Sequence, residues 1–185
     1  MTTMHQLISD SLAELRRRTG WESLDILETG TIRNTGEEYR AGDGWSSLAF
    51  AEDVAAHGGS LTSVDLDTTH AQKVLEDHGL LDHVNLLTGY SIDVMGRMLA
   101  KKHRYEVLFL DSDNDAQLIL HELMLARLMS KKGTLLMLDD IDLDGRSEAV
   151  KGLRAIPYLE AAGIEYKIVD RDGGTHRTGF CVAWL

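Results

Sequence analysis

The sequence predicts an α/β protein with a doubly wound, mostly parallel seven-stranded sheet, helices on both faces and a C-terminal antiparallel β-hairpin. Short apolar runs alternate five times with segments of helical periodicity, as in a parallel sheet covered by helices. The runs EVLFL and TLLML are almost wholly apolar, which is typical of central strands buried on both faces. The last two apolar runs have no helix between them, and a parallel pair would need a crossover of about a dozen residues.

The first half of the chain contains four predicted helices and three predicted strands. Apolar residues at helical spacing mark the helices, and glycines at 20, 58–59 and 79 mark the ends of three of them. The predicted helices are 5–18, 45–57, 68–78 and 92–102, and the strands are 24–27, 60–64 and 84–87.

The second half contains the two most apolar strands and the predicted hairpin. Strands are expected at 106–110 and 134–138, followed by helices at 116–130 and 147–162 respectively. The final strands, 164–169 and 179–185, are separated only by DRDGGTHRT, so they are expected to pair antiparallel.

Composition indicates a single domain over residues 1–185 and disfavours nucleic acid and membranes as partners. A chain of 185 residues can enclose one sizeable core. The net charge of −11 opposes binding to nucleic acid or to anionic membranes. Cys181 is the single cysteine, which fits a reducing cytoplasm, and its apolar surroundings predict a buried core residue. No apolar stretch is long enough to span a membrane.

Acidic residues follow most of the predicted strands. In open α/β sheets, ligands bind beyond the carboxyl ends of the strands, so these side chains are expected at the binding edge. A helix N-cap explains one acid in a loop, but not the adjacent pair after 134–138. The acidic strand ends are at Glu28, Asp65, Asp67, Asp111, Asp113, Asp115, Asp139 and Asp140.

Three separate functions would account for these acids. Asp65, at the end of the second strand, is placed to accept hydrogen bonds from a ribose diol. Glu28 and Asp113 could balance a cationic ligand. Asp111 with the pair at 139–140 could converge on a hard divalent cation such as Mg²⁺, which prefers oxygen ligands.

The stretch ETGTIRNTGEEYRAGDGWSS contains four glycines but matches neither GxGxxG nor the GxxxxGK[ST] phosphate loop. A ligand with a pyrophosphate is therefore disfavoured, and an acidic pocket suits a ligand with positive charge, such as a sulfonium and an amino group.

At this point the sequence resembles a known family. E-x-G after the first strand, V-D-L-D after the second and the closing hairpin resemble the class I S-adenosylmethionine-dependent methyltransferases, whose fold is Rossmann-like. Within that class, FLDSDNDAQL followed by GTLLMLDD is similar to the cation-dependent O-methyltransferases of the catechol and caffeoyl-coenzyme A type. Their segments run D-A-D-K-D-N-Y and then D-N after the fifth strand.

The resemblance implies a binding site for S-adenosylmethionine. Glu28 and Gly30 would line the methionine and ribose side, and Ser46 would hold the cofactor's carboxylate near a helix N-terminus. Asp65 would bind the ribose hydroxyls.

Three more cofactor contacts follow from the same resemblance. Tyr90 and Ser91 would flank the adenine, and Asp113 would face the cofactor's amino group.

The resemblance also implies a metal-assisted methyl transfer to a hydroxyl of a small molecule. Asp111, Asp139 and Asp140 would bind a divalent cation, expected to be Mg²⁺, and Asp111 and Asn114 occupy the positions of the catalytic residues. The family usually has a lysine, a candidate base, at the position of Asn114. His121, His176 or a metal-activated water are the alternatives for that role.

Two further departures concern the metal pair and the first loop. Asp140 replaces the asparagine of the D-N pair, so the metal site would be more anionic. The segment 31–43 is an insertion that would form a lid, a part of the acceptor pocket, or a solvated excursion.

Two other functions remain as alternatives. A cofactor-binding partner or regulatory protein without transferase activity would explain the lost lysine. A metal-binding phospho-receiver also gathers aspartates at strand ends, but it has its acidic pair after the first strand, where this chain has Glu28-Thr29. The terminal strand FCVAWL could be an edge strand that pairs with a second copy, which leaves a homodimer open.

Overall fold

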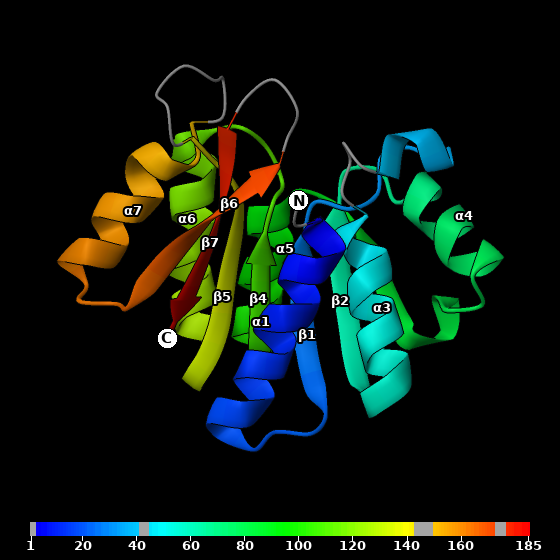
Figure 1. Ribbon diagram of the computed structural model, residues 1–185, viewed down its shortest axis with the longest axis horizontal. Helices are drawn as coiled ribbons and strands as arrows, with labels where there is room; N and C mark the ends of the chain where they lie inside the picture. The colour runs from blue at the N-terminus through cyan, green and yellow to red at the C-terminus, as the bar shows by residue number, and fades with distance from the viewer. Residues whose placement is uncertain (1–2, 41–44, 143–149, 173–176) are drawn as a thin grey trace.

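The computed structural model describes residues 3–40, 45–142, 150–172 and 177–185, and its centre is one seven-stranded sheet in the order β3-β2-β1-β4-β5-β7-β6 (Figure 1). The strands are β1 (Leu24–Thr29), β2 (Gly59–Asp65), β3 (Val84–Thr88), β4 (Tyr105–Leu110), β5 (Ser130–Asp142), β6 (Tyr166–Asp172) and β7 (Arg177–Trp184).

The sheet confirms the predicted fold class. Strands β3, β2, β1, β4 and β5 pair in parallel, and β7 pairs antiparallel with both β5 and β6. The order of the strands reverses between β1 and β4, and that is where ligands bind in doubly wound sheets. One expectation was wrong: FCVAWL belongs to β7, which lies between β5 and β6, so the edges of the sheet are β3 and β6.

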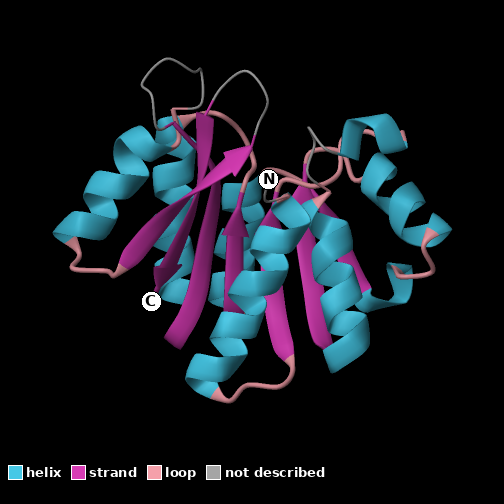
Figure 2. Cartoon of the chain, in the orientation of Figure 1, coloured by secondary structure: helices cyan, strands magenta, loops and turns pink. Residues whose placement is uncertain are grey.

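Helices cover the two faces of the sheet (Figure 2). The helices are α1 (Met4–Thr19), η1 (Glu37–Tyr39), α3 (Ser46–His57), α4 (Thr69–Asp77), η2 (Leu81–His83), α5 (Ser91–Ala100), α6 (Ala116–Met129) and α7 (Gly152–Ala161). Buried residues of α1, α3 and α4 pack with one face, and those of α5, α6 and α7 pack with the other. The two resulting cores fix the sheet between them.

The alternation of side chains explains why the central strands are so apolar. In β4, Val107 and Phe109 belong to one core cluster, whereas Leu108 and Leu110 belong to the other. Successive side chains of a strand point to opposite faces, so a strand covered on both faces needs apolar residues throughout.

Local sequence signals determine where α1 begins and ends and where α6 begins. Thr3 caps α1 by accepting a hydrogen bond from the backbone of Gln6, and Gly20 ends it in the left-handed conformation. Asp115 caps α6, because its carboxylate accepts hydrogen bonds from the backbone N–H groups of Gln117 and Leu118 at 2.7 and 3.2 Å.

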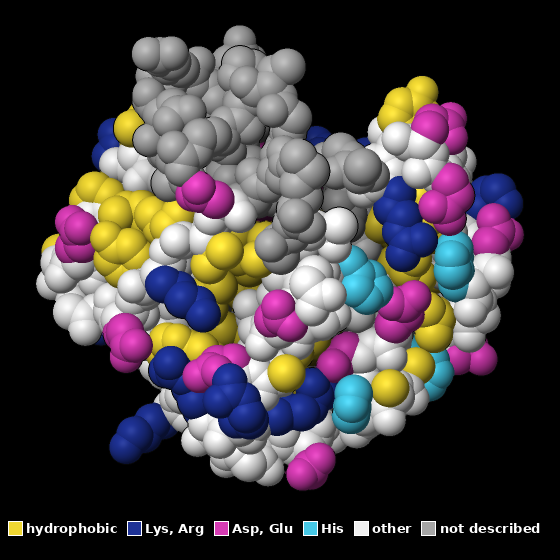
Figure 3. All heavy atoms as spheres, in the orientation of Figure 1, with side chains coloured by type: hydrophobic (Ala, Val, Ile, Leu, Met, Phe, Trp, Pro, Cys, Tyr) yellow, Lys and Arg dark blue, Asp and Glu magenta, His cyan; other side chains and the backbone are white. Residues whose placement is uncertain are grey.

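The surface face drawn in Figure 3 is uneven in character: hydrophobic side chains gather around α7 and β6, whereas charges of both signs lie together over the end of α1. At that end Arg16 pairs with Asp53, and Arg17 and Arg18 pair with Glu14. None of the described helices is long and apolar enough to cross a membrane.

Candidate functional site

The carboxyl ends of neighbouring parallel strands bring the predicted acidic positions to one edge of the sheet. Glu28 is near the end of β1, Asp65 ends β2, and Asp111 follows β4 directly. Since β1 lies between β2 and β4, the topology makes these positions neighbours in space.

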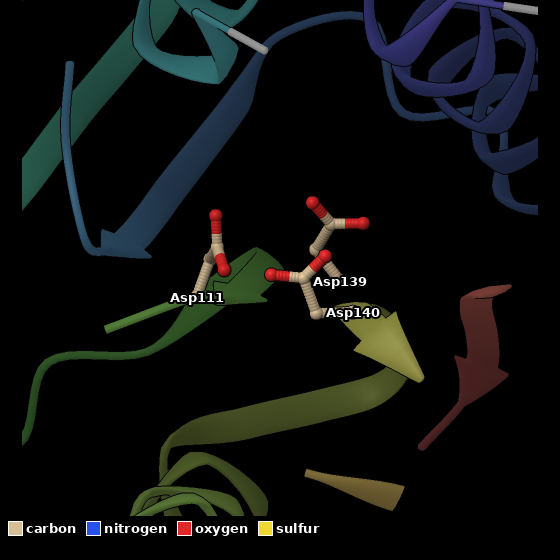
Figure 4. Close-up of side chains that lie close together, drawn as sticks. All are labelled: Asp111, Asp139 and Asp140. Carbon is tan, nitrogen blue, oxygen red and sulfur yellow. The ribbon is translucent and has the colours of Figure 1, made fainter. Parts of the chain in front are cut away.

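Three of the acids form a cluster. Asp111, Asp139 and Asp140 each offer a carboxylate oxygen within 4.8 Å of the other two (Figure 4). Asp139 is buried, whereas Asp111 and Asp140 are partly exposed and their side chains point toward one another. Oxygen atoms at this spacing suit a hard divalent cation, so the residues present fit the predicted metal.

A β-bulge explains how two adjacent residues of one strand reach the same cluster. Between Leu138 and Ile141, strand β5 advances three residues while β7 advances two, from Cys181 to Gly179, so β5 carries one extra residue. Asp140 has a left-handed backbone with φ of 54°, which a regular strand does not allow.

Lys151 also belongs to the cluster, and sequence reasoning missed it. Its ammonium contacts Asp111 Oδ1 directly and lies 3.7 Å from Asp140 Oδ2. The Lys151 side chain is only 2% exposed. Burial alone would lower the pKa of Lys151, but Asp111 and Asp140 more than compensate and raise it above its ordinary value.

The position of Lys151 depends on a backbone contact between Ile141 and Val150. Val150 forms an isolated antiparallel bridge with Ile141, next to the bulge, and this bridge holds the following residue against the end of β5. The prediction of a helix over 147–162 placed this lysine within a helix. Residues 147–149 lie outside the described part of the chain, and in the described part α7 starts at Gly152, directly after Lys151. No local pattern in the sequence indicated the contact with Asp111, which is 40 residues away.

Glu28 lies beneath the site with its carboxyl group completely buried. Its Oε1 accepts a hydrogen bond from Ser46 at 2.5 Å, and its Oε2 accepts from Ser47 and Ser63 at 2.6 and 2.5 Å. Burial raises the pKa of Glu28 to about 7, although the three hydroxyls act in the opposite direction. The group therefore links β1, β2 and the start of α3. None of these three hydrogen bonds was predicted, and of the three serines only Ser46 was predicted as a site residue.

Gly30 is required by a close approach of two strand ends. Its φ is +83°, and a Cβ at this position would lie 2.3 Å from the carbonyl oxygen of Asp111. The glycine therefore lets the backbone after β1 pass directly over the backbone that carries Asp111.

Asp65 organises the turn after β2 and stays partly exposed. Its Oδ2 accepts a hydrogen bond from the backbone of Thr31 at 2.8 Å, and its Oδ1 accepts from Leu66 at 2.6 Å. This arrangement joins the end of β2 to the start of the 31–43 insertion.

The remaining predicted cofactor residues surround the same edge. Tyr90 is 49% exposed at the start of α5, and Ser91 beside it is buried. Asp113 and Asn114 are exposed in the loop after β4, where Asp113 accepts a hydrogen bond from the backbone of Asn114 at 2.7 Å. Their exposure leaves these side chains accessible to a ligand.

The 31–43 insertion is anchored at both of its described ends. Ile32 is buried in the core, and the guanidinium of Arg40 lies 5.6 Å from the centre of the Trp45 ring. Between them Tyr39 is 52% exposed on η1. Residues 41–43, together with Gly44, lie outside the described part of the chain.

Other titratable groups near the site differ in accessibility. Glu122 on α6 is buried, its Oε2 accepts a hydrogen bond from the Thr29 hydroxyl at 3.0 Å, and burial raises its pKa. His121 is exposed, and its ring lies 2.8 Å from the Gln117 amide nitrogen. His176 lies outside the described residues. Cys181 is buried as predicted, and burial raises the pKa of its thiol to about 12.

Comparison with known proteins finds methyltransferases both by a family profile and among individual sequences. A sequence profile described as a methyltransferase domain matches residues 40–141, more than half of the chain. A catechol O-methyltransferase from Niastella koreensis is 26% identical over 129 residues, which cover 68% of this chain and 52% of that protein. The chain thus spans about half the length of this curated relative.

Solved structures share the fold over nearly the whole chain. A candidate O-methyltransferase from Klebsiella pneumoniae superposes with a TM-score of 0.69 at 27% identity, covering 94% of this chain and 77% of that one. An O-methyltransferase from Bacillus cereus, solved in complex with S-adenosylhomocysteine, gives a TM-score of 0.70 at 21% identity, with 98% and 90% coverage.

Proposed function

Since the chain belongs to the methyltransferase-domain family, within the class I S-adenosylmethionine-dependent O-methyltransferases, we propose that it transfers a methyl group from S-adenosylmethionine to a hydroxyl of a small molecule. The observation that supports this most is the acidic cluster Asp111, Asp139 and Asp140 at the carboxyl ends of β4 and β5, beside the reversal of the strand order. The cluster lies next to the strand ends where the cofactor is expected.

The proposed cofactor site consists of the predicted residues around the carboxyl ends of β1, β2 and β3. The exposed carboxylates are suited to the positive charge and the hydroxyls of S-adenosylmethionine, and the missing side chain of Gly30 lets the backbone after β1 approach the backbone of Asp111 closely. The proposed residues of the cofactor site are Glu28, Gly30, Ser46, Asp65, Tyr90, Ser91 and Asp113. Because Glu28 is enclosed by serines, it would act through the position of Ser46 rather than as an exposed acid.

The reaction would be an in-line displacement. The acceptor hydroxyl releases its proton to a water molecule, its oxygen forms a bond to the methyl carbon, the bond from that carbon to sulfur breaks, and the sulfonium becomes a neutral thioether. A divalent cation, expected to be Mg²⁺, would lower the pKa of the acceptor hydroxyl when bound at the cluster. Asp111, Asp139 and Asp140 would hold that cation and thereby position the acceptor.

Asn114 would orient the acceptor rather than remove its proton. An amide offers a donor and an acceptor for hydrogen bonds but has no titratable nitrogen at neutral pH. The side chain is exposed in the loop that follows Asp111, so it is accessible to a hydroxyl compound.

A calorimetric titration with S-adenosylmethionine, with and without Mg²⁺, tests the proposal. We expect saturable binding in both conditions, because the predicted cofactor contacts are separate from the cation site. Binding that is absent in both conditions would refute the proposal.

Transfer assays then test the cation. With a panel of catechols and other hydroxyl compounds, we expect a chelator and the substitution Asp139→Asn each to reduce turnover by about a hundredfold or more, as loss of a catalytic group does. Asp67→Asn, an exposed strand-end acid outside the cluster, is the matched control and should retain activity. Turnover that is unchanged by the chelator would remove the cation from the mechanism.

A cofactor-binding protein without transferase activity is the second candidate. Asn114 in place of the family's lysine favours it. Tight binding of S-adenosylmethionine with no turnover on any acceptor of the panel would support this alternative over the enzyme.

A further inference from the structure

The cluster of aspartates already contains a positive charge of its own. The ammonium of Lys151 contacts Asp111 and lies 3.7 Å from Asp140, with nearly all of its side chain shielded from solvent. A buried lysine is unfavourable unless it is paired, and here it has more than one carboxylate around it.

We propose that Lys151 is a built-in counter-cation of this cluster, which competes with a divalent ion for the oxygens of Asp111 and Asp140 and sets the affinity of the site. This inference rests on the cation site of the proposed function and adds a positioning residue to it.

The charge balance supports the proposal. Among the described residues, three carboxylates facing one ammonium carry two net negative charges, the same as a pair of carboxylates without a lysine. The related D-N pattern has an uncharged asparagine at the position of Asp140, so the extra acid and Lys151 compensate each other. Without the lysine, three carboxylates within 4.8 Å would repel one another.

The geometry also keeps the lysine in place. The bridge between Val150 and Ile141 fixes the backbone on one side, and on the other a Cβ at Gly152 would lie only 3.1 Å from the Ile141 side chain. The ammonium therefore reaches the cluster from an anchored backbone, which lets it hold Asp111 and Asp140 together before any ion binds.

Mn²⁺ binding, measured by electron paramagnetic resonance in the absence of cofactor, tests the inference. Lys151→Met should bind Mn²⁺ about tenfold more tightly or better, because a competing charge a few ångströms away is removed. Lys151→Arg keeps the positive charge, so its Mn²⁺ affinity should stay within about threefold of that of wild type. Lys131→Met, which removes a contact with Glu106 at the opposite ends of the strands, is the matched control and should not change the affinity.

A charge-balanced double variant provides the second measurement. Asp140→Asn together with Lys151→Met restores two net negative charges, so its Mn²⁺ affinity should return to within about threefold of wild type. Without metal, Lys151→Met should melt at a lower temperature than wild type and gain more from saturating Mn²⁺. If that variant does not fold, Lys151→Gln decides in its place: this side chain is uncharged but polar, and the variant should also bind Mn²⁺ about tenfold more tightly than wild type.

Unchanged or weaker Mn²⁺ binding by Lys151→Met would overturn the inference, and so would a double variant that binds as tightly as the single one. A titration of the same proteins with S-adenosylmethionine separates the two proposals. Cofactor binding without any Mn²⁺ binding would refute the inference and keep the methyltransferase. The expected Mn²⁺ series without cofactor binding would support the inference and refute the methyltransferase.

Discussion

Glu28 shows how the environment of a single residue changes the chemistry that its sequence position suggests. E-x-G after a strand predicted a carboxylate that lines a cofactor, whereas the structure encloses this group among Ser46, Ser47 and Ser63. Hydroxyl groups can donate or accept, so the carboxyl can be accommodated both with and without its proton. We interpret it as a pH-sensitive link beneath the site.

The stability of the protein should therefore depend on pH through Glu28. Its pKa of about 7 lies above the ordinary value of 4.5, so the folded protein retains a proton that the unfolded chain releases. This stabilisation is complete below pH 4.5 and is lost as the pH rises through about 7. Glu28→Gln removes the effect, so its unfolding free energy should rise relative to wild type by about 3 kcal/mol between pH 4.5 and pH 8.

Urea denaturation of both proteins at several pH values measures this difference. Glu22→Gln, which changes an exposed glutamate, is the control. Its unfolding free energy should change with pH in the same way as that of wild type. A constant difference between Glu28→Gln and wild type over the whole range would contradict the prediction.

At the scale of elements, the loop between β4 and α6 separates two acids that look alike in the sequence. Asp115 caps α6 with hydrogen bonds from two backbone N–H groups, whereas Asp113 is exposed and accepts a hydrogen bond from the backbone N–H of the adjacent Asn114. Asp115 thus stabilises the start of the helix, whereas the Asp113 side chain remains accessible to the cofactor.

Two alanine variants test this division. Asp115→Ala should lower the unfolding free energy by about 1 kcal/mol, as loss of a helix N-cap does. Asp113→Ala should change it by less than about 0.5 kcal/mol but weaken the binding of S-adenosylmethionine. Thermal denaturation and calorimetry on both variants measure the two effects, and a reversed order of the two stability changes would contradict the assignment.

At the scale of the whole molecule, the strand order concentrates negative charge at one edge. The chain has a net charge of −11, and the sheet brings the ends of β1, β2, β4 and β5 together. Clefts lined by one sign of charge attract ligands of the opposite sign, an attraction that salt screens. S-adenosylmethionine carries one more positive charge than S-adenosylhomocysteine.

The affinity for S-adenosylmethionine should fall several-fold when the ionic strength rises from about 0.02 M to about 0.3 M, and the affinity for S-adenosylhomocysteine should fall less. Calorimetric titrations at these two salt concentrations measure both. Equal salt dependence of the two ligands would show that the acidic edge does not contribute to binding.

Much of the architecture was predictable because it depends on local patterns. Periodicity and glycine stops predicted α1, from Met4 to Thr19, within one residue at each end, and the missing crossover predicted the antiparallel hairpin. Strand β5 is longer than its apolar run of 134–138 because polar residues at both ends also pair with neighbouring strands. The interior position of β7 could not be inferred, since no local signal specifies where a hairpin joins a sheet.

The sequence by itself determined the elements, their order and the acidic strand ends, because these follow from local periodicity and from the rule that parallel strands end at one edge. The tertiary structure decided which acidic side chains lie close together, how deeply each is buried and which charges it pairs with. The bulge that re-aims Asp140, the bridge that brings Lys151 to Asp111 and the burial of Glu28 all depend on contacts between distant segments. Such contacts set desolvation and charge pairing, which no local pattern of residues encodes.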